Sequence, residues 1–439
     1  MNFLRTTDIT NFQSVIWSHS ERFRLRLLLL IPILNAAADS TIYYFIQPNT
    51  EGVNPGVIRG FILLIFIGFF GVKRISNTIV NKVILIFLIY LFLLTLLSSD
   101  FNTSFFNGYI KWFVPMMMLP IGYYYIRSRD SLIKLIFSFV IGAFLVCINL
   151  TIAQFTGFGI SAYVDNSFYN GGAGVGITNQ LAIVLLTYPI LLRVWSRFSN
   201  NEKWFILITG LLSLVYLIVS MKRAGLIGLA GGGIIFFYFA PNKRKILKYA
   251  VLCIIILILT FPFYSEILID RYNVRVEQTK MYEEEGRYRE FIYVIKEFKE
   301  GNIWHKLFGS EPFNTSQFFG MKYFKRGRMI HGDFSLYLYG TGLIGITLYF
   351  SIFGTLFYQV KKYHDKIKQN SQLREIIASF IAVLFAAFLI SATGSGSIGE
   401  KCLVYLYLGS VLGFLKTLTQ GDRDMFKQPT EKPEIDHPV

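Results

Sequence analysis

The sequence predicts an all-α, polytopic integral membrane protein of about twelve transmembrane helices, with one large extracytoplasmic loop that contains short helices. Of its 439 residues, 53% are hydrophobic and only 16% are charged, whereas a soluble domain carries about 25% charged residues. Apolar runs recur along the chain, and lysine and arginine gather in alternate connections. The net charge of +16 is therefore interpreted as an excess of basic residues in cytoplasmic loops, and no nucleic-acid partner is expected.

The apolar runs approach or reach the ~20 residues that a helix needs to cross a bilayer. In lipid the backbone must pair its own polar groups, so each run is expected to form a helix. Nine of the runs fall within residues 1–264 and three within residues 333–419. We place them near residues 24–46, 57–72, 82–98, 109–126, 132–156, 177–195, 203–220, 223–240, 246–264, 334–358, 375–392 and 401–418.

The first apolar run has two interpretations. Three arginines, the last being Arg26, precede it, and Ala36–Ala38 follow its core, which is the pattern of a cleaved signal peptide. However, a polar lead of about twenty residues precedes the run, and the run continues to Phe45, close to the ~20 residues of a membrane span. We therefore expect a first transmembrane helix.

The loop charges predict an orientation in the bacterial inner (cytoplasmic) membrane. Connections rich in lysine and arginine alternate with connections that are almost free of both. By the positive-inside rule both termini are cytoplasmic, and the large loop at residues 265–332 is extracytoplasmic. The tail at residues 420–439 is polar and carries Pro429, Pro433 and Pro438, so we expect it to be disordered.

The large loop holds most of the residues that are suited to chemistry. Arg287 to Glu300 has a helical pattern in which Phe291, Val294, Ile295 and Phe298 share one face, and Gly301 ends it. This amphipathic helix is expected either to lie in the membrane interface or to pack on the rest of the loop. Arg287 and Arg289 lie two residues apart and so diverge on a helix; such a charge run is more often a solvated face.

A second basic position lies outside the large loop. Lys222 and Arg223 occupy the short hairpin S-M-K-R-A-G, on the outer side where the topology disfavours cations. The guanidinium group of arginine suits a bound phosphate or diphosphate. The alternative is a side chain that snorkels from a helix end.

His331 and Asp333 precede the run that returns into the membrane. An imidazole suits general-base work on a sugar hydroxyl, and Asp333 would orient it or act itself; the alternative is a structural histidine. No histidine pair at helical spacing and no D-x-D motif is present, so no metal site is expected. The glycine-rich segment at residues 171–176 lacks the Lys-Ser/Thr of a nucleotide loop, and a nucleotide site is rejected.

Taken in order, these motifs resemble the bacterial O-antigen polymerases and O-antigen ligases. The resemblance covers roughly residues 220–350, and the other helices agree only in number and topology. It rests on the S-M-K-R-A-G hairpin, the loop opening G-R-Y-R-E-F, then L-F-G-S-E-P-F-N, and H-G-D-F-S-L-Y-L-Y-G-T-G-L-I-G at re-entry. The sequence departs from the family pattern at Lys222, which stands in place of a hydroxyl residue, and at Gly332, in place of a polar one.

The resemblance implies transfer of a glycan from an undecaprenyl-diphosphate carrier to an acceptor. In that reaction Arg223 and Arg287, with Arg289 and Lys222 as further candidates, would hold the diphosphate. His331, with Asp333, would act on the acceptor hydroxyl. No cofactor is expected, because cations neutralise the leaving diphosphate. The expected partners are the lipid-linked donor and acceptor, the bilayer, and as candidates a chain-length regulator and a flippase.

Three functions remain open at this point. The leading one is polymerisation of lipid-linked repeat units into a surface polysaccharide such as O-antigen or capsule. An O-antigen ligase, which transfers glycan to lipid A-core or protein, shares the chemistry. A polysaccharide flippase is the alternative from another class, but transporters favour intramembrane charges and symmetric broken helices. The sequence shows few deep charges, Asp39 among them, and no symmetry of its halves.

Overall fold

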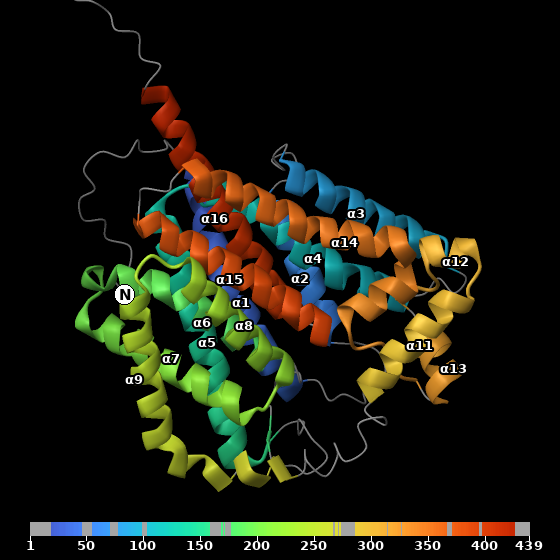
Figure 1. Ribbon diagram of the computed structural model, residues 1–439, viewed down its shortest axis with the longest axis horizontal. Helices are drawn as coiled ribbons and strands as arrows, with labels where there is room; N and C mark the ends of the chain where they lie inside the picture. The colour runs from blue at the N-terminus through green and yellow to red at the C-terminus, as the bar shows by residue number, and fades with distance from the viewer. Residues whose placement is uncertain are drawn as a thin grey trace, which may run out of the picture.

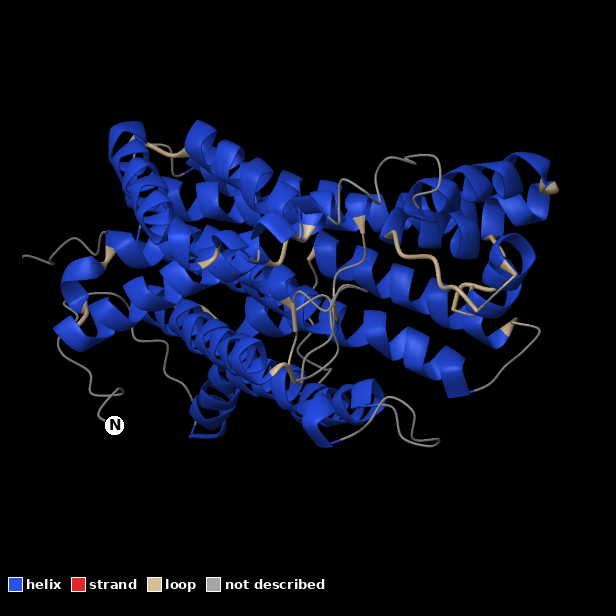
Figure 2. Cartoon of the chain, turned by 90° about the horizontal axis from the view of Figure 1, so that it is seen from below, coloured by secondary structure: helices blue, strands red, loops and turns tan. Residues whose placement is uncertain are grey.

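The computed structural model of the chain is helical, and every regular element drawn in Figure 2 is a helix. The glycine-rich segment after residue 171 and the chain after Met425 lie outside the described residues. The structure describes residues 19–45, 55–70, 78–98, 103–158, 168–169, 171, 177–266, 268–270, 272–273, 286–313, 315–325, 327–366, 371–394 and 397–425.

Long helices follow the predicted apolar runs, which confirms the all-helical fold class for the described residues. Helix α16 continues past Gln420, where the tail was expected to begin. The helices are α1 (His19–Phe45), α2 (Pro55–Phe70), α3 (Ile79–Leu96), α4 (Thr103–Tyr125), α5 (Arg129–Thr156), α6 (Thr178–Arg193), α7 (Asn200–Val219), α8 (Arg223–Phe239), α9 (Lys243–Thr260), α14 (Asp333–Lys366), α15 (Ser371–Thr393) and α16 (Ile398–Met425).

Six helices within the described residues are long and apolar enough to cross a membrane: α3, α5, α7, α14, α15 and α16. Helices α2, α8 and α9 contain shorter apolar segments. Large apolar side chains on the outside of the bundle, such as Leu93 at 51% exposed and Ile258 at 66%, fit a surrounding of lipid. These features support a membrane environment, while the total of twelve spans stays a prediction.

Glycines allow the central helices to approach closely. On α16 a Cβ at Gly409 would lie 2.1 Å from the carbonyl oxygen of Leu119, and one at Gly413 would lie 2.3 Å from that of Tyr123 on α4. Small residues spaced four apart are typical of helix crossings in membranes, where close backbone packing replaces the hydrophobic effect. The pair α4–α16 therefore forms the middle of the bundle, and on α8 a Cβ at Gly232 would lie 2.9 Å from the carbonyl oxygen of Ala382 on α15.

The polar segment before α14 folds into a small helical unit at one end of α3 and α14 (Figure 1). We call this unit, residues 286–332, the cap, and the end of the bundle where it lies the cap end. The cap contains α11 (Gly286–Glu300), α12 (Ile303–Phe308), a π-helical turn (Ser316–Gly320) and α13 (Met321–Phe324). Its small core consists of Val294, Phe319 and Ile330, which pack with Tyr339 of α14.

Helix α11 packs through a face that is shifted from the expected one, although Ile295 and Phe298 are half-buried as part of it. Val294 is buried as expected, but Phe291 is 53% exposed, and the carboxylate-bearing Glu290 is only 2% exposed. The buried face thus centres on Glu290 and Val294, which lie one turn apart. The difference arises because a charged partner inside the cap, described below, compensates for the burial of Glu290.

Helix α14 is bent at Gly342, where the backbone adopts φ +61°. The sequence predicted one uninterrupted apolar run from residue 334 to 358. The bend instead separates a short arm, residues 333–341, from the long segment at residues 343–366 (Figure 1). The arm carries Asp333 into the bundle, and the long segment runs along α3.

Candidate functional site

A buried carboxylate organises the inside of the cap. Glu290 of α11 accepts a hydrogen bond at Oε1 from Arg328 Nε at 2.6 Å. His331 Nδ1 lies 2.9 Å from the same oxygen, and the backbone N–H of His331 donates to Oε2 at 3.0 Å. The Glu290 side chain is 2% exposed, while that of His331 is 45% exposed. Glu290 therefore fixes His331 by both backbone and ring, with part of the ring facing outward.

These partners determine the charge of Glu290. Burial alone would raise the pKa of this carboxyl, but the hydrogen bonds from His331 and Arg328 and the charge of a protonated His331 outweigh burial, so the pKa of Glu290 lies below its ordinary value. An ionised carboxylate can only accept hydrogen bonds. His331 Nδ1 must then carry a proton, so that in the neutral form of the ring the lone pair lies on Nε2. This is the arrangement that a general base requires.

Asp333 has a different partner from the one expected. Its Oδ1 lies 3.1 Å from Lys401 Nζ on α16, and both side chains are almost completely buried. The ammonium group also lies 3.4 Å from the centre of the Trp112 ring on α4. The position beside His331 Nδ1 that the sequence suggested for Asp333 is taken by Glu290. Asp333 instead ties the start of α14 to α16 and α4.

The first turns of α6, α8, α14 and α16 meet at the cap end of the bundle. Lys401 joins α16 to α14, and its neighbour Glu400, 2% exposed, is within hydrogen-bonding reach of Asn179 on α6. A Cβ at Gly225 of α8 would lie 2.8 Å from Asn179 Oδ1, so only glycine allows this approach. The Ser220 hydroxyl, just before α8, donates to Thr178 Oγ1 at 3.2 Å.

Arg223 is the first residue of α8 and stands at this meeting point. Its side chain is exposed, and Lys222 before it is half-buried. Lys222 supplies no side-chain cap to α8, and Ile177 supplies none to α6. A helix N-terminus carries a partial positive charge, and two cations there add to it. The cap end thus combines N–H groups, an arginine and a lysine in an arrangement suited to a phosphate group.

Arg287 and Arg289, the other arginines predicted to bind a diphosphate, lie on α11 of the cap and not at the start of α8. Arg287 lies in α11, but its side chain is outside the described residues. Arg289 is half-buried; it donates to the Tyr293 hydroxyl at 3.2 Å and lies 5.9 Å from the ring centre of Phe324. The Arg289 guanidinium therefore packs against aromatic side chains within the cap. His305 of α12 packs edge-on against Tyr339, with the ring centres 6.2 Å apart.

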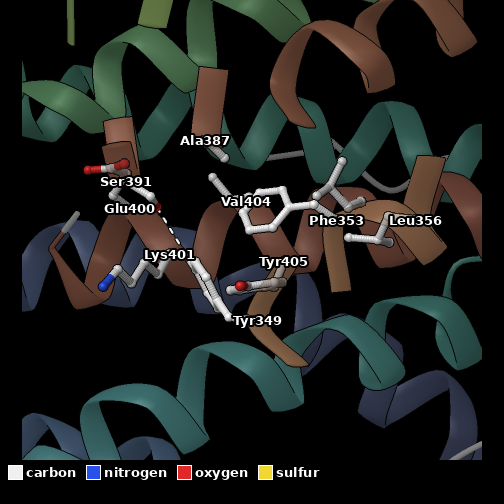
Figure 3. Close-up of a pocket in the computed structure, with 10 residues that line it drawn as sticks. Tyr349, Phe353, Leu356, Ala387, Ser391, Glu400, Lys401, Val404 and Tyr405 are labelled. Carbon is white, nitrogen blue, oxygen red and sulfur yellow. Dashed lines mark hydrogen bonds between the residues drawn. The ribbon is translucent and has the colours of Figure 1, made fainter. Parts of the chain in front are cut away.

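A cavity of about 20 Å³ lies behind Lys401, towards the middle of the bundle. Figure 3 shows Tyr349, Tyr405, Ser391 and Glu400 around it, with the Lys401 amine directed away from the tyrosine rings. Tyr349 and Ser391 share a hydrogen bond of 3.1 Å. The cavity has room for about one water molecule, whereas ligand pockets measure about 300 Å³ or more. This cavity is therefore too small for a ligand larger than water.

The sequence analysis missed four residues of this arrangement: Glu290, Arg328, Glu400 and Lys401. Glu290 stands in the charged run R-Y-R-E-F, which is typical of a solvated surface. A signal was present for Glu400 and Lys401, since two adjacent charges next to an apolar run are rare unless they are paired or functional. In the part of the chain that the structure describes, no three histidine, cysteine, aspartate or glutamate side chains gather so that they could hold a metal ion.

No protein-family model and no curated protein sequence matches this chain.

Proposed function

We propose that this chain is a membrane glycosyltransferase that joins undecaprenyl-diphosphate-linked repeat units into a surface polysaccharide. The observation that carries the proposal is the Glu290–His331 pair at the base of the cap, with Nε2 left as a base. In the proposed topology twelve helices cross the inner membrane, both termini are cytoplasmic, and the cap lies outside. The site then stands at the level where a lipid carrier presents its diphosphate.

His331 would act on the acceptor sugar. The acceptor hydroxyl oxygen attacks the anomeric carbon of the donor while its proton passes to His331 Nε2. The imidazolium that forms is stabilised by Glu290 Oε1, which accepts from Nδ1–H at 2.9 Å. Arg328, on the same oxygen, holds the carboxylate in place. Glu290 is therefore a positioning residue and His331 the catalytic base.

Arg223 and Lys222 would bind the leaving group. The bond from the anomeric carbon to the diphosphate oxygen breaks, and the electron pair leaves with the diphosphate. The exposed guanidinium of Arg223 and the N-terminus of α8 are suited to stabilise that charge. The two half-sites are connected through the first turn of α16, since Lys401 holds Asp333 and Glu400 reaches Asn179, which packs on α8.

The test is a surface-glycan gel from the source bacterium after deletion of the gene. The strain is complemented with the wild-type chain, His331→Ala or Arg223→Ala. The matched controls are His364→Ala, a histidine near the far end of α14, and Arg244→Ala, an exposed arginine near the start of α9. We expect the ladder of long glycans to be lost with the two site variants and kept with the two controls, at equal amounts of protein in the membrane.

The gel also separates the related functions. A ladder that collapses to a single repeat unit supports polymerisation. Loss of all glycan from the acceptor, with long polymer remaining on the lipid carrier, identifies a ligase that uses the same site. An unchanged ladder with His331→Ala and Arg223→Ala contradicts the site. Accumulation of repeat units on the cytoplasmic side indicates a flippase instead.

A further inference from the structure

Helix α12 of the cap presents an unusually apolar outer surface. Ile303 is 62% exposed, Trp304 67% and Phe308 36%. Trp304 and Phe308 lie one turn apart and stack on each other with ring centres 5.9 Å apart. The opposite side of the helix faces inward, where His305 meets Tyr339 of α14. A six-residue helix with three exposed large apolar side chains exposes far more apolar surface than a solvated loop requires.

The backbone of α12 is locked onto the bend of α14. Gly309, which follows α12 with φ +76°, would place a Cβ 2.3 Å from the Thr341 nitrogen. Gly342, with φ +61°, would place one 2.5 Å from the Leu307 carbonyl carbon. The Ser310 N–H also donates to the Tyr339 oxygen at 2.8 Å. The segments around Gly309 and Gly342 thus touch backbone to backbone, and these contacts fix the position of α12 relative to α14.

This contact places α12 beside the last turns of α3. The Tyr90 hydroxyl of α3 donates to the Thr341 oxygen at 2.8 Å, and Ser98, just beyond α3, hydrogen-bonds Glu311, just beyond α12. From Tyr90 to Leu96 the helix rises about 9 Å. The C-terminal end of α12 is therefore held close to the last turns of α3, at the end of this helix.

The neighbouring surface of the bundle is lipid-facing. At this end of α3, Leu93 and Leu96 are each 51% exposed and Leu97 is 80% exposed; Leu343, just after the bend in α14, is 44% exposed. The aromatic pair of α12 continues this apolar surface at the end of the span. Tryptophan is enriched at this level of membrane proteins, because its ring suits the boundary between headgroups and acyl chains. The exposed Lys299, at the end of α11, is suited to lipid phosphates.

We propose that Ile303, Trp304 and Phe308 are embedded in the headgroup–acyl boundary of the bilayer, so that α12 anchors the cap to the membrane surface. The occupant of this face is lipid. A second copy of the chain and a soluble partner are the competing occupants. The inference rests on the placement of α12 and is independent of the proposed enzyme activity.

The experiment measures the depth of Trp304 in the membrane. The other four tryptophans, Trp17, Trp112, Trp195 and Trp204, are replaced by phenylalanine, and the full chain is reconstituted in vesicles of phosphatidylcholine and phosphatidylglycerol with brominated acyl chains. A Trp204-only protein is the positive control, because Trp204 is 65% exposed on α7; a Trp112-only protein is the negative control, because Trp112 is 4% exposed. We expect brominated lipid to reduce Trp304 emission about twofold, as for Trp204, with little quenching by aqueous iodide.

Quenching of Trp304 by iodide but not by brominated lipid overturns the proposal. Protection from both quenchers also overturns it, and dimeric mass in the vesicles would then identify a second copy as the occupant. If the single-tryptophan proteins do not fold, Trp304→Phe in the otherwise natural chain replaces them. That variant must then lose a lipid-quenchable part of the total emission, and an unchanged lipid-quenchable fraction contradicts the anchor.

Discussion

At the scale of single residues, the site depends on how one buried carboxylate is satisfied. The Glu290 carboxylate accepts hydrogen bonds from Arg328, from the His331 ring and from the His331 backbone N–H, so its negative charge is compensated inside the cap. A glutamine at this position is isosteric but carries an N–H₂ group that donates. Donation to Nδ1 would move the histidine proton to Nε2, the atom that we propose as the base.

We therefore predict that Glu290→Gln reduces glycan transfer about 100-fold or more, close to the effect of removing the base itself. Glu297→Gln is the matched control: it makes the same change on the same helix, at a carboxylate that pairs with Lys322 and Tyr323. The rate of chain extension in membranes containing equal amounts of each variant is the measurement. Equal rates for the two variants would show that Glu290 has no part in the reaction.

The same residue gives the cap a pH dependence. Because the folded pKa of Glu290 lies below its ordinary value of 4.5, its contribution to cap stability is present at and above that value and is lost as the pH falls through the lowered pKa. Glu297 has its pKa lowered in the same direction: burial alone would raise it, but Lys322 and Tyr323 outweigh this effect. We predict that the cap stays ordered from neutral pH down to the ordinary carboxyl pKa of 4.5 and opens as the pH falls through the lowered pKa values of these two residues.

Emission of a Trp304-only protein during an acid titration follows this opening. The Glu290→Gln/Glu297→Gln protein should show a weaker pH dependence, because neither residue then changes its charge. Identical titrations of the two proteins would exclude Glu290 and Glu297 as the cause of the cap's opening at low pH.

At the scale of elements, the Asp333–Lys401 pair joins α14 to α16 beneath Trp112. Lys401→Met would leave Asp333 buried without its cation, and loss of one member of a buried pair destabilises by about 3–5 kcal/mol. We predict a lowered thermal midpoint for Lys401→Met in detergent and recovery of most of the loss in Lys401→Met/Asp333→Leu. An additive double variant would show that the two groups are not coupled.

The helices and the cap differ in how far the sequence predicts them. Each long apolar run became a helix, because in lipid no other backbone structure satisfies its own polar groups. The bend at Gly342 was not predicted, because Y-G-T-G-L-I-G reads as part of an apolar run and the contact with Leu307 that requires a glycine is remote in the sequence.

The residues of the candidate site differ in the same way in how far the sequence predicts them. His331 and Arg223 stood out because each is unusual for its place in the sequence. Glu290 and Lys401 did not, since their burial depends on partners 41 and 68 residues away.

At the scale of the whole molecule, a site that combines His331 with Arg223 requires the cap and the N-termini of α6, α8, α14 and α16 to lie on one side of the membrane. The contacts between Lys401 and Asp333 and between Asn179 and Gly225 place these helix ends together. The basic residues Lys243 and Arg244 follow the C-terminus of α8, so they lie at the opposite end of α8 from Gly225 and the cap end. The positive-inside rule then assigns the cap end to the outside.

Topology reporters test this assignment directly. We predict that alkaline phosphatase inserted at Asn302, before α12, is active, and that the same enzyme fused after Val439 is inactive while a fluorescent protein there is bright. An insertion between Pro241 and Lys243 is the internal control and should behave like the C-terminal fusion, since it lies among basic residues. If the cap and the C-terminus report the same side, an even number of helices must separate them instead of the three that follow the cap. If the Asn302 insertion is inactive, His331 would lie on the cytoplasmic face, where a transferase of this kind would have no exported acceptor to extend.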